Sequence, residues 1–167
     1  MSGQRKFYTF RGYALASAQQ RDGLTPSMED YLEMIYRLSQ AEGYTRMLEL
    51  AAALHVQPPS ASRMVQRLAE ENLLVYEKYS IIRLTPQGEE IGRYLLTRHN
   101  ILEDFLRLLG LEDVLEDAEK IEHNISAAAL ARLEDLLAFF QQNTYCQTQW
   151  ESFRAQDNKK NKEPHGS

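Results

Sequence analysis

Cysteine is almost absent from this sequence, which has Cys146 as its only thiol among 167 residues. One thiol cannot form a disulfide within the chain, and it cannot supply the several thiolates of a structural zinc or iron–sulfur site. No apolar run approaches the roughly 20 residues that span a bilayer. The basic residues near the N-terminus are not followed by an apolar stretch and a cleavage site, as a secretory signal requires. We therefore expect a cytoplasmic protein with no membrane partner.

Recognisable catalytic patterns are also missing. The sequence has no Gly-rich phosphate-binding loop, and no Ser/His/Asp or Cys/His arrangement that would activate a nucleophile. A di-metal carboxylate enzyme is a remaining alternative, but such enzymes use a Glu-x-x-His motif from each of two helices. Here Glu119 and His123 are four residues apart, and no second pair of this kind follows. We expect a protein that is not an enzyme.

The residues that are present give an ordinary soluble composition with an uneven charge. Hydrophobic residues make up 43% of the chain and charged residues 26%, with a net charge of −5. This length and composition suit one compact domain, or two small ones that share a core. Residues 99–140 hold three basic and ten acidic side chains, whereas residues 44–98 hold seven basic and six acidic ones. The asymmetry indicates a part that faces a polyanion, joined to a part that binds cations.

Hydrophobic periodicity and start signals predict a mainly α-helical chain. Thr25-Pro26 and Thr85-Pro86 each provide an N-cap and a proline at the first helical position, so a helix should follow each pair. We expect a short second helix over Glu49–Leu54, a turn over Val56–Ser60, and then a third helix. Two short β-rich runs, Leu74–Tyr76 and Ile81–Leu84, should form a hairpin. The predicted parts are an N-terminal extension (1–24), a winged-helix domain (25–84), a long linker helix (85–109), a helical segment (110–153) and a polar, disordered tail (154–167).

Three helices followed by a two-stranded hairpin are typical of a winged helix-turn-helix. In this arrangement the third helix enters the DNA major groove and the hairpin lies along the backbone. Small hydroxyls permit close approach to phosphates, and Arg and Gln can read base edges. On these residues alone a solvated helix face is the simpler interpretation, but the order of the elements favours DNA. The predicted DNA contacts are Arg46, Pro59, Ser60, Ser62, Arg63, Gln66, Arg67 and Lys78.

Carboxylates and imidazoles occur at spacings that place them together on helix faces. The first helix offers an i, i+3 pair, a later one offers an i, i+3, i+4 triple, and the long helix carries one histidine. Carboxylates packed together repel one another unless a cation neutralises them. Oxygen and imidazole donors without thiolate suit one or two Mn²⁺ or Fe²⁺ ions, and Co²⁺, Zn²⁺ or Cd²⁺ could also bind in vitro. The candidate ligands are Asp30, Glu33, His99, Glu119, Glu122 and His123.

Four segments of the sequence together resemble the manganese transport regulators, bacterial repressors of the diphtheria-toxin/iron-dependent repressor superfamily. These segments are Thr25–Tyr31, Val65–Leu68, Val75–Tyr79 and Ile121–His123, and the similarity extends from about residue 25 to about residue 142. The resemblance implies a homodimer that binds a palindromic DNA operator and represses manganese-uptake genes. It makes residues 110–153 a dimerisation domain, and it implies two manganese ions per subunit. The family's ligand positions match the same six candidate residues.

The sequence favours the manganese branch of this superfamily, although it departs from the pattern in places. In the iron-sensing branch the positions of Asp30 and Glu119 resemble sites that hold a methionine and a cysteine, so oxygen donors there favour manganese. The wing tip reads Tyr79-Ser80-Ile81, where relatives tend to have an arginine and a glycine. Glu103 matches an accessory-site position of the iron branch, and we expect it to be solvated. An iron(II)-responsive or small-molecule-responsive winged-helix regulator remains the alternative.

Overall fold

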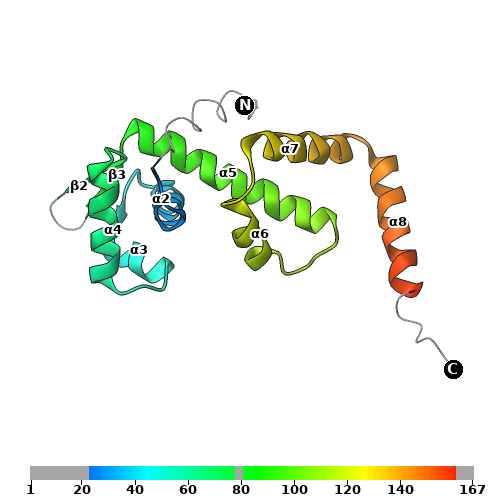
Figure 1. Cartoon of the computed structure of the whole chain (residues 1–167), viewed down its shortest axis with the longest axis horizontal. Helices are drawn as coiled ribbons and strands as arrows, with labels where there is room; N and C mark the ends of the chain where they lie inside the picture. The colour runs from blue at the N-terminus through cyan, green and yellow to red at the C-terminus, as the bar shows by residue number, and fades with distance from the viewer. Residues whose placement is uncertain (1–22, 78–80, 161–167) are drawn as a thin grey trace.

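The computed structural model of this chain describes residues 23–77 and 81–160 and is mainly helical (Figure 1). A group of short helices with a small sheet lies at one end, and α5 runs from it to the C-terminal helices. None of the described helices is both long and apolar enough to cross a membrane. The elements are α2 (Pro26–Ser39), β1 (Thr45–Arg46), α3 (Met47–Ala53), α4 (Pro58–Glu70), β2 (Leu74–Glu77), β3 (Ile81–Leu84), α5 (Pro86–Leu108), α6 (Leu115–Glu122), α7 (Ala127–Gln142) and α8 (Thr144–Lys160).

The N-terminal domain has the predicted winged-helix order, but its sheet has three strands and not two. The strand order is β1-β3-β2, with antiparallel pairing throughout. In the added pair, Thr45 faces Ile82 and Arg46 faces Ile81. A two-residue strand is too short to show any alternation in the sequence, so only the folded chain reveals it.

The boundaries of the helix-turn-helix also differ from the predicted ones. α3 starts at Met47, two residues before the expected start, because the Glu49 carboxylate accepts a hydrogen bond from the Arg46 N–H at 3.1 Å and stabilises the first turn. α4 starts at Pro58, so the turn predicted over Val56–Ser60 ends at Gln57, earlier than its sequence indicates. Prolines are harmless in the first helical turn, because their missing N–H groups have no partner there in any case.

The core of this domain joins α2, α4 and the sheet to the first half of α5. Leu32, Ile35, Val65, Ile82 and Leu95 are completely buried. α5 begins where predicted, because the Thr85 hydroxyl accepts the Gly88 N–H at 3.1 Å.

A close approach of α2 to α5 depends on Gly92. A Cβ atom at this position would lie 2.6 Å from the Tyr36 Cβ. Since both helices carry candidate metal ligands, their spacing is part of the geometry of the site.

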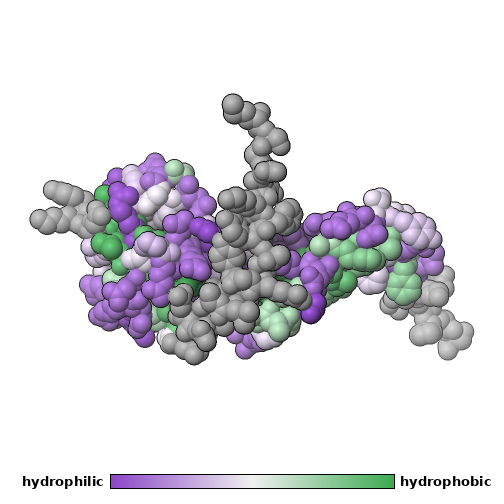
Figure 2. Space-filling view, turned by 90° about the horizontal axis from the view of Figure 1, so that it is seen from above, coloured by the Kyte–Doolittle hydropathy of each residue, from purple (hydrophilic) through white to green (hydrophobic). Residues whose placement is uncertain are grey.

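The C-terminal helices are more exposed than the rest of the chain. In α7 only Leu130 is fully buried. Leu136, Phe139 and Phe153 are 39%, 48% and 62% exposed, and hydrophobic atoms form a strip over α7 and α8 in Figure 2.

α8 corrects the prediction for the tail. The helix extends to Lys160, so residues 154–160 are helical where disorder was expected. The Trp150 indole and the Arg154 guanidinium both donate to the Leu108 carbonyl, at 2.7 and 3.0 Å, and thereby attach α8 to the end of α5. Hydrogen bonds between residues so far apart leave no pattern in the sequence of a polar segment. The sequence alone therefore did not predict the helix over residues 154–160. The rest of the predicted tail (161–167) and residues 1–22 of the predicted extension lie outside the described residues.

Candidate metal centre and nucleic-acid interface

A cavity of about 470 Å³ lies between α2, the turn after α3, α5 and α6. All six predicted ligands lie on its walls, together with Ala53 at the end of α3 and the turn residues Leu54 and His55. The structure therefore brings together residues from three helices that are far apart in the sequence, as Figure 1 shows for α2, α5 and α6. The predicted ligands that line the cavity are Asp30, Glu33, His99, Glu119, Glu122 and His123.

Five of these residues form two adjoining donor clusters. Asp30, Glu122 and His123 make one cluster, and Glu33, His99 and Glu122 make the other; within each, one donor atom per residue lies within 4.8 Å of the others. Glu122 belongs to both, so its carboxylate could bridge two ions. Glu119 is exposed and belongs to neither cluster.

Local structure explains how each helix presents its donors. Asp30 and Glu33 lie one turn apart on α2, whereas Glu122 is the last residue of α6 and His123 is its C-cap. His99 lies midway along α5, with its Nδ1 2.9 Å from a Glu122 oxygen.

The chemistry of the donors fits a divalent cation. Glu33, His99 and Glu122 are only 8%, 5% and 3% exposed. Two buried carboxylates this close are costly unless a positive charge compensates them. Oxygen and imidazole donors without a thiolate suit manganese or ferrous iron.

The pKa shifts in the site all favour the protonated forms. Burial raises the pKa of the Asp30 carboxyl, and burial likewise raises the pKa of the Glu33 carboxyl against the opposing effect of Arg37. The hydrogen bond with Glu122 raises the pKa of the His99 imidazole. Since ligands must be deprotonated to bind a metal, ion binding at this site should release protons.

Two further carboxylates contact the histidines: Glu29, which the sequence patterns did not single out, and Glu103, which was expected to be solvated. Glu29 accepts a hydrogen bond from Arg98 at 3.0 Å, and the same oxygen lies 3.0 Å from His123 Nδ1. Glu103 lies 3.5 Å from His99 Nε2 and accepts from Arg107 at 2.9 Å, so the expectation that it is merely solvated is wrong. The sequence offered one indication of the Glu29–Arg98 pair. Glu29 directly precedes the candidate ligand Asp30, and Arg98 directly precedes the candidate ligand His99.

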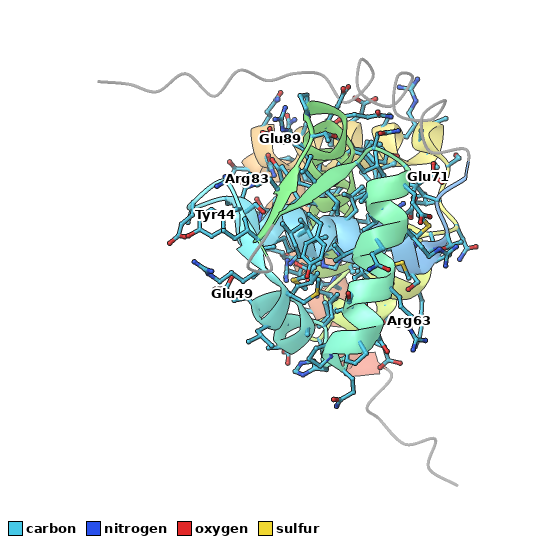
Figure 3. All side chains as sticks on the ribbon, turned by 90° about the vertical axis from the view of Figure 1, so that its left-hand side faces the viewer. Tyr44, Glu49, Arg63, Glu71, Arg83 and Glu89 are labelled. Atoms are coloured by element: carbon cyan, nitrogen blue, oxygen red, sulfur yellow. The ribbon has the colours of Figure 1, made fainter. Side chains whose placement is uncertain are left out.

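The predicted DNA-reading residues lie on the open side of α4. Ala61, Val65 and Leu68 point into the core, whereas Arg63, in Figure 3, projects away from it. The residues on this surface are all exposed except the half-buried Ser62: Pro59, Ser60, Ser62, Arg63, Gln66 and Arg67. The remaining predicted contact in the wing, Lys78, lies outside the described residues.

A second basic group lies where the edge strand β1 meets the central strand β3. The Arg46 and Arg83 guanidiniums lie 5.5 and 5.1 Å from the ring centre of Tyr44, within cation–π range. Tyr44 and Arg83 are seen together at this edge in Figure 3. Arg46 was predicted as a DNA contact; Arg83 was not, because a single charge in a strand carries no pattern.

A winged-helix domain whose first helix shares an acidic, histidine-containing cavity with a linker helix and a further helical segment defines a metal-dependent DNA-binding regulator. Comparison with known families agrees with this class. Residues 23–82 match the model described as "Iron dependent repressor, N-terminal DNA binding domain". Residues 85–151 match "Iron dependent repressor, metal binding and dimerisation domain". The chain belongs to the iron-dependent repressor family, of which it is an MntR-like member.

Curated relatives of this chain are also named as transcriptional regulators. The chain is 48% identical to the HTH-type transcriptional regulator MntR of Shouchella clausii over 121 residues, which are 71% of this chain and 85% of the relative. It is 41% identical to the regulator of the same name from Bacillus pumilus over 141 residues, which are 83% of this chain and 98% of the relative. Since these relatives are transcriptional regulators, the chain is a DNA-binding regulator and not an enzyme.

Solved structures of metal-dependent regulators share the fold. The manganese regulator SloR superposes with a TM-score of 0.61 at 32% identity, covering 70% of this chain and 55% of that one. A manganese-dependent transcriptional repressor in complex with manganese gives 0.59 at 30% identity, covering 66% and 52%. ScaR with bound Zn²⁺ gives 0.57 at 32% identity, covering 67% and 54%. The chain thus spans about half the length of these structures.

Proposed function

We propose that this protein is a manganese(II)-responsive repressor of manganese-uptake genes. The observation that carries the proposal is the pair of donor clusters joined by Glu122, built only from oxygen and imidazole donors. This donor set favours manganese or ferrous iron over the thiolate-preferring metals. The manganese-regulator names of the relatives and of solved structures with this fold support manganese.

The proposed ligands are the six predicted residues that line the cavity. We propose two ions per subunit because the donors form two clusters. Asp30 and His123 would hold one ion, and Glu33 and His99 the other, with Glu122 common to both. Glu119, exposed on the cavity wall, would complete the set from α6. A bound cation would add positive charge beside these carboxylates, of which Glu33 also pairs with Arg37 at 2.6 Å. Fe²⁺, Co²⁺, Zn²⁺ and Cd²⁺ fit the same donor types in vitro.

The coupling to DNA follows from which elements carry the ligands. α2 belongs to the DNA-binding domain, and α6 belongs to the segment matched by the dimerisation model. Arg37 pairs with Glu33 at 2.6 Å. Without a bound ion, the remaining repulsion among Asp30, Glu33 and Glu122 would oppose a close fit of α2 to α6. Once they are neutralised, α2 and α6 are held at one spacing. A preference of about 1–3 kcal/mol for the competent geometry would change DNA affinity roughly 5–150-fold.

The proposed dimer uses the exposed apolar strip on α7 and α8. Two subunits joined there would present two copies of α4, one to each half-site of a palindromic operator. The spacing of the half-sites would then depend on how α5 and α6 orient each DNA-binding domain. Arg46 and Arg83 would contact phosphates beside the groove that α4 reads.

The test is the binding of DNA from upstream of a manganese-transporter gene in the source genome. Fluorescence anisotropy is measured with and without Mn²⁺ at fixed salt, because phosphate contacts make affinity strongly salt-dependent. We expect tight binding only with Mn²⁺. The same titration with Fe²⁺ under anaerobic conditions tests the iron-responsive alternative. Binding that ignores every metal would support a small-molecule-responsive regulator and overturn the proposal.

A further inference from the structure

The imidazole of His123 lies between carboxylates of two kinds. Its Nε2 lies 3.2 Å from an Asp30 oxygen and 3.6 Å from a Glu122 oxygen, both of which belong to a donor cluster. Its Nδ1 lies 3.0 Å from an oxygen of Glu29, which belongs to neither cluster. One ring nitrogen thus faces the proposed metal ligands, and the other faces a carboxylate outside them.

Glu29 is itself held in place from α5. The Arg98 guanidinium donates to the same Glu29 oxygen at 3.0 Å, and both side chains are buried, Arg98 being 3% and Glu29 9% exposed. Arg98 directly precedes the candidate ligand His99, so one turn of α5 supplies both a ligand and the group that fixes Glu29. A buried ion pair of this kind loses its compensation when either partner is removed.

We propose that Glu29 is a positioning residue of the metal centre, which directs His123 Nε2 into the cavity by accepting a hydrogen bond from Nδ1–H. A neutral imidazole carries one proton, so a proton fixed on Nδ1 leaves the lone pair on Nε2. Arg98 holds the Glu29 carboxylate in this orientation through its hydrogen bond at 3.0 Å. The proposal deepens, and rests on, the proposed metal-binding function.

The competing role for the Glu29–Arg98 pair is purely structural, as a buried link between α2 and α5. Loss of a structural link would lower stability but would not change which nitrogen of His123 carries the proton. Loss of a positioning residue would change the tautomer of His123 in the metal-free protein and would also weaken metal binding. Outer-shell partners of ligand histidines typically contribute 10–100-fold to affinity.

The experiment uses the full chain with paired substitutions, because removing one partner alone would leave a buried uncompensated charge. Glu29→Leu with Arg98→Met removes both charges and the hydrogen-bond acceptor, while keeping apolar bulk. Glu29→Gln with Arg98→Met removes both charges but keeps an oxygen that can accept from Nδ1–H. The matched control, Glu116→Leu with Lys120→Met, removes an exposed pair from α6.

Two measurements are made on each protein. The first is the proton position on His123 in the metal-free state, from nitrogen-15 imidazole NMR shifts at about pH 8.5, above the ordinary histidine pKa of about 6.5. The second is Mn²⁺ affinity, from the signal of free Mn²⁺ in electron paramagnetic resonance. Thermal unfolding followed by circular dichroism establishes that each protein is folded.

We expect the Leu/Met variant to lose the Nδ1–H preference and to bind Mn²⁺ about 10–100-fold more weakly. The Gln/Met variant should keep the tautomer and lose less affinity, and the control should match the wild type. An unchanged tautomer in the folded Leu/Met variant, or equal losses in both variants, would overturn the positioning role. If the Leu/Met variant does not fold, the tautomer in wild type and in the Gln/Met variant decides, with Nε2–H in both refuting the proposal.

The same measurements distinguish failure of the proposed metal-responsive function from failure of the proposed role of Glu29. A wild-type protein that does not bind Mn²⁺ at all would refute the metal-responsive function. The tautomer of His123 in the metal-free protein would still report whether Glu29 positions the ring.

Discussion

Glu122 is the residue on which both donor clusters depend. Its carboxylate lies 2.9 Å from His99 Nδ1 and 3.6 Å from His123 Nε2. Glu122→Ala should therefore abolish the Mn²⁺-dependent increase in DNA affinity, which we place at roughly 5–150-fold, while residual nonspecific binding persists. DNA anisotropy with and without Mn²⁺ measures this. Glu116→Ala, on the exposed side of α6, is the control, and a metal dependence that survives in Glu122→Ala would refute the site.

The protonation of the site predicts opposite pH trends for the two forms of the protein. Since the pKa values of Asp30, Glu33 and His99 are raised in the folded chain, the folded state binds more protons than the unfolded one. The free energy of unfolding without metal should then fall as the pH rises through these raised pKa values. Of the three, the pKa of His99 lies above the ordinary histidine value of 6.5.

Metal binding reverses this trend, because the ion competes with protons for the same atoms. The increase in Tm caused by Mn²⁺ should therefore grow from about pH 5 to about pH 8. Calorimetric unfolding across this range, with and without Mn²⁺, is the measurement. An increase in Tm that is independent of pH would mean that these groups do not bind the ion.

At the scale of elements, the spacing of α2 and α5 is set by a missing side chain. Gly92→Ala places a Cβ 2.6 Å from Tyr36 Cβ, so the helices must separate. Overpacking of this kind costs about 1–3 kcal/mol, of which a better helix propensity recovers up to about 1 kcal/mol. We expect lower stability in denaturant unfolding and weaker Mn²⁺ binding together. Asn100→Ala, exposed on the same helix, should leave Mn²⁺ affinity unchanged without lowering stability. Unaltered Mn²⁺ affinity in Gly92→Ala would show that the helix spacing does not control the site.

The recognition helix and the sheet edge should contribute differently to DNA binding. Arg63→Ala, on α4, should cost about 1–3 kcal/mol and relax the preference for particular bases. Arg83→Ala, at the Tyr44 ring, should weaken binding to all sequences and reduce the salt slope by about 1, because a phosphate contact is lost. Anisotropy against operator and scrambled DNA at several salt concentrations separates the two effects. Arg132→Ala on α7 is the control, and equal salt slopes in Arg83→Ala and wild type would exclude a phosphate contact.

At the scale of the whole molecule, the exposed strip on α7 and α8 should hold two subunits together. Phe139, 48% exposed and edge-on to Phe140, lies within the strip. Phe139→Glu places a charge in an apolar interface, which is costly when it is buried. We expect sedimentation velocity to show a shift toward monomer, together with loss of tight operator binding. Gln142→Glu, exposed near the end of the same helix, should remain dimeric; a dimeric Phe139→Glu would place the interface elsewhere.

The sequence determined most of the helices and the β2–β3 hairpin, because local rules govern them. Thr25-Pro26 and Thr85-Pro86 fix the starts of α2 and α5, and the hydrophobic period fixes the buried faces of the helices. Residue type and spacing also sufficed to select six candidate ligands, since donors at i, i+3 and i+4 share a face whatever the rest of the fold does.

The tertiary structure decided the features that depend on contacts between distant parts of the chain. β1 exists only because β3 pairs with it, and α8 continues past Arg154 while Trp150 and Arg154 hold the end of α5. The division of the ligands into two clusters joined by Glu122, and the placing of Glu29 behind His123, depend on how α2, α5 and α6 pack. Distances between residues about 20 to 90 positions apart follow from the packing of whole helices, which no short sequence pattern encodes.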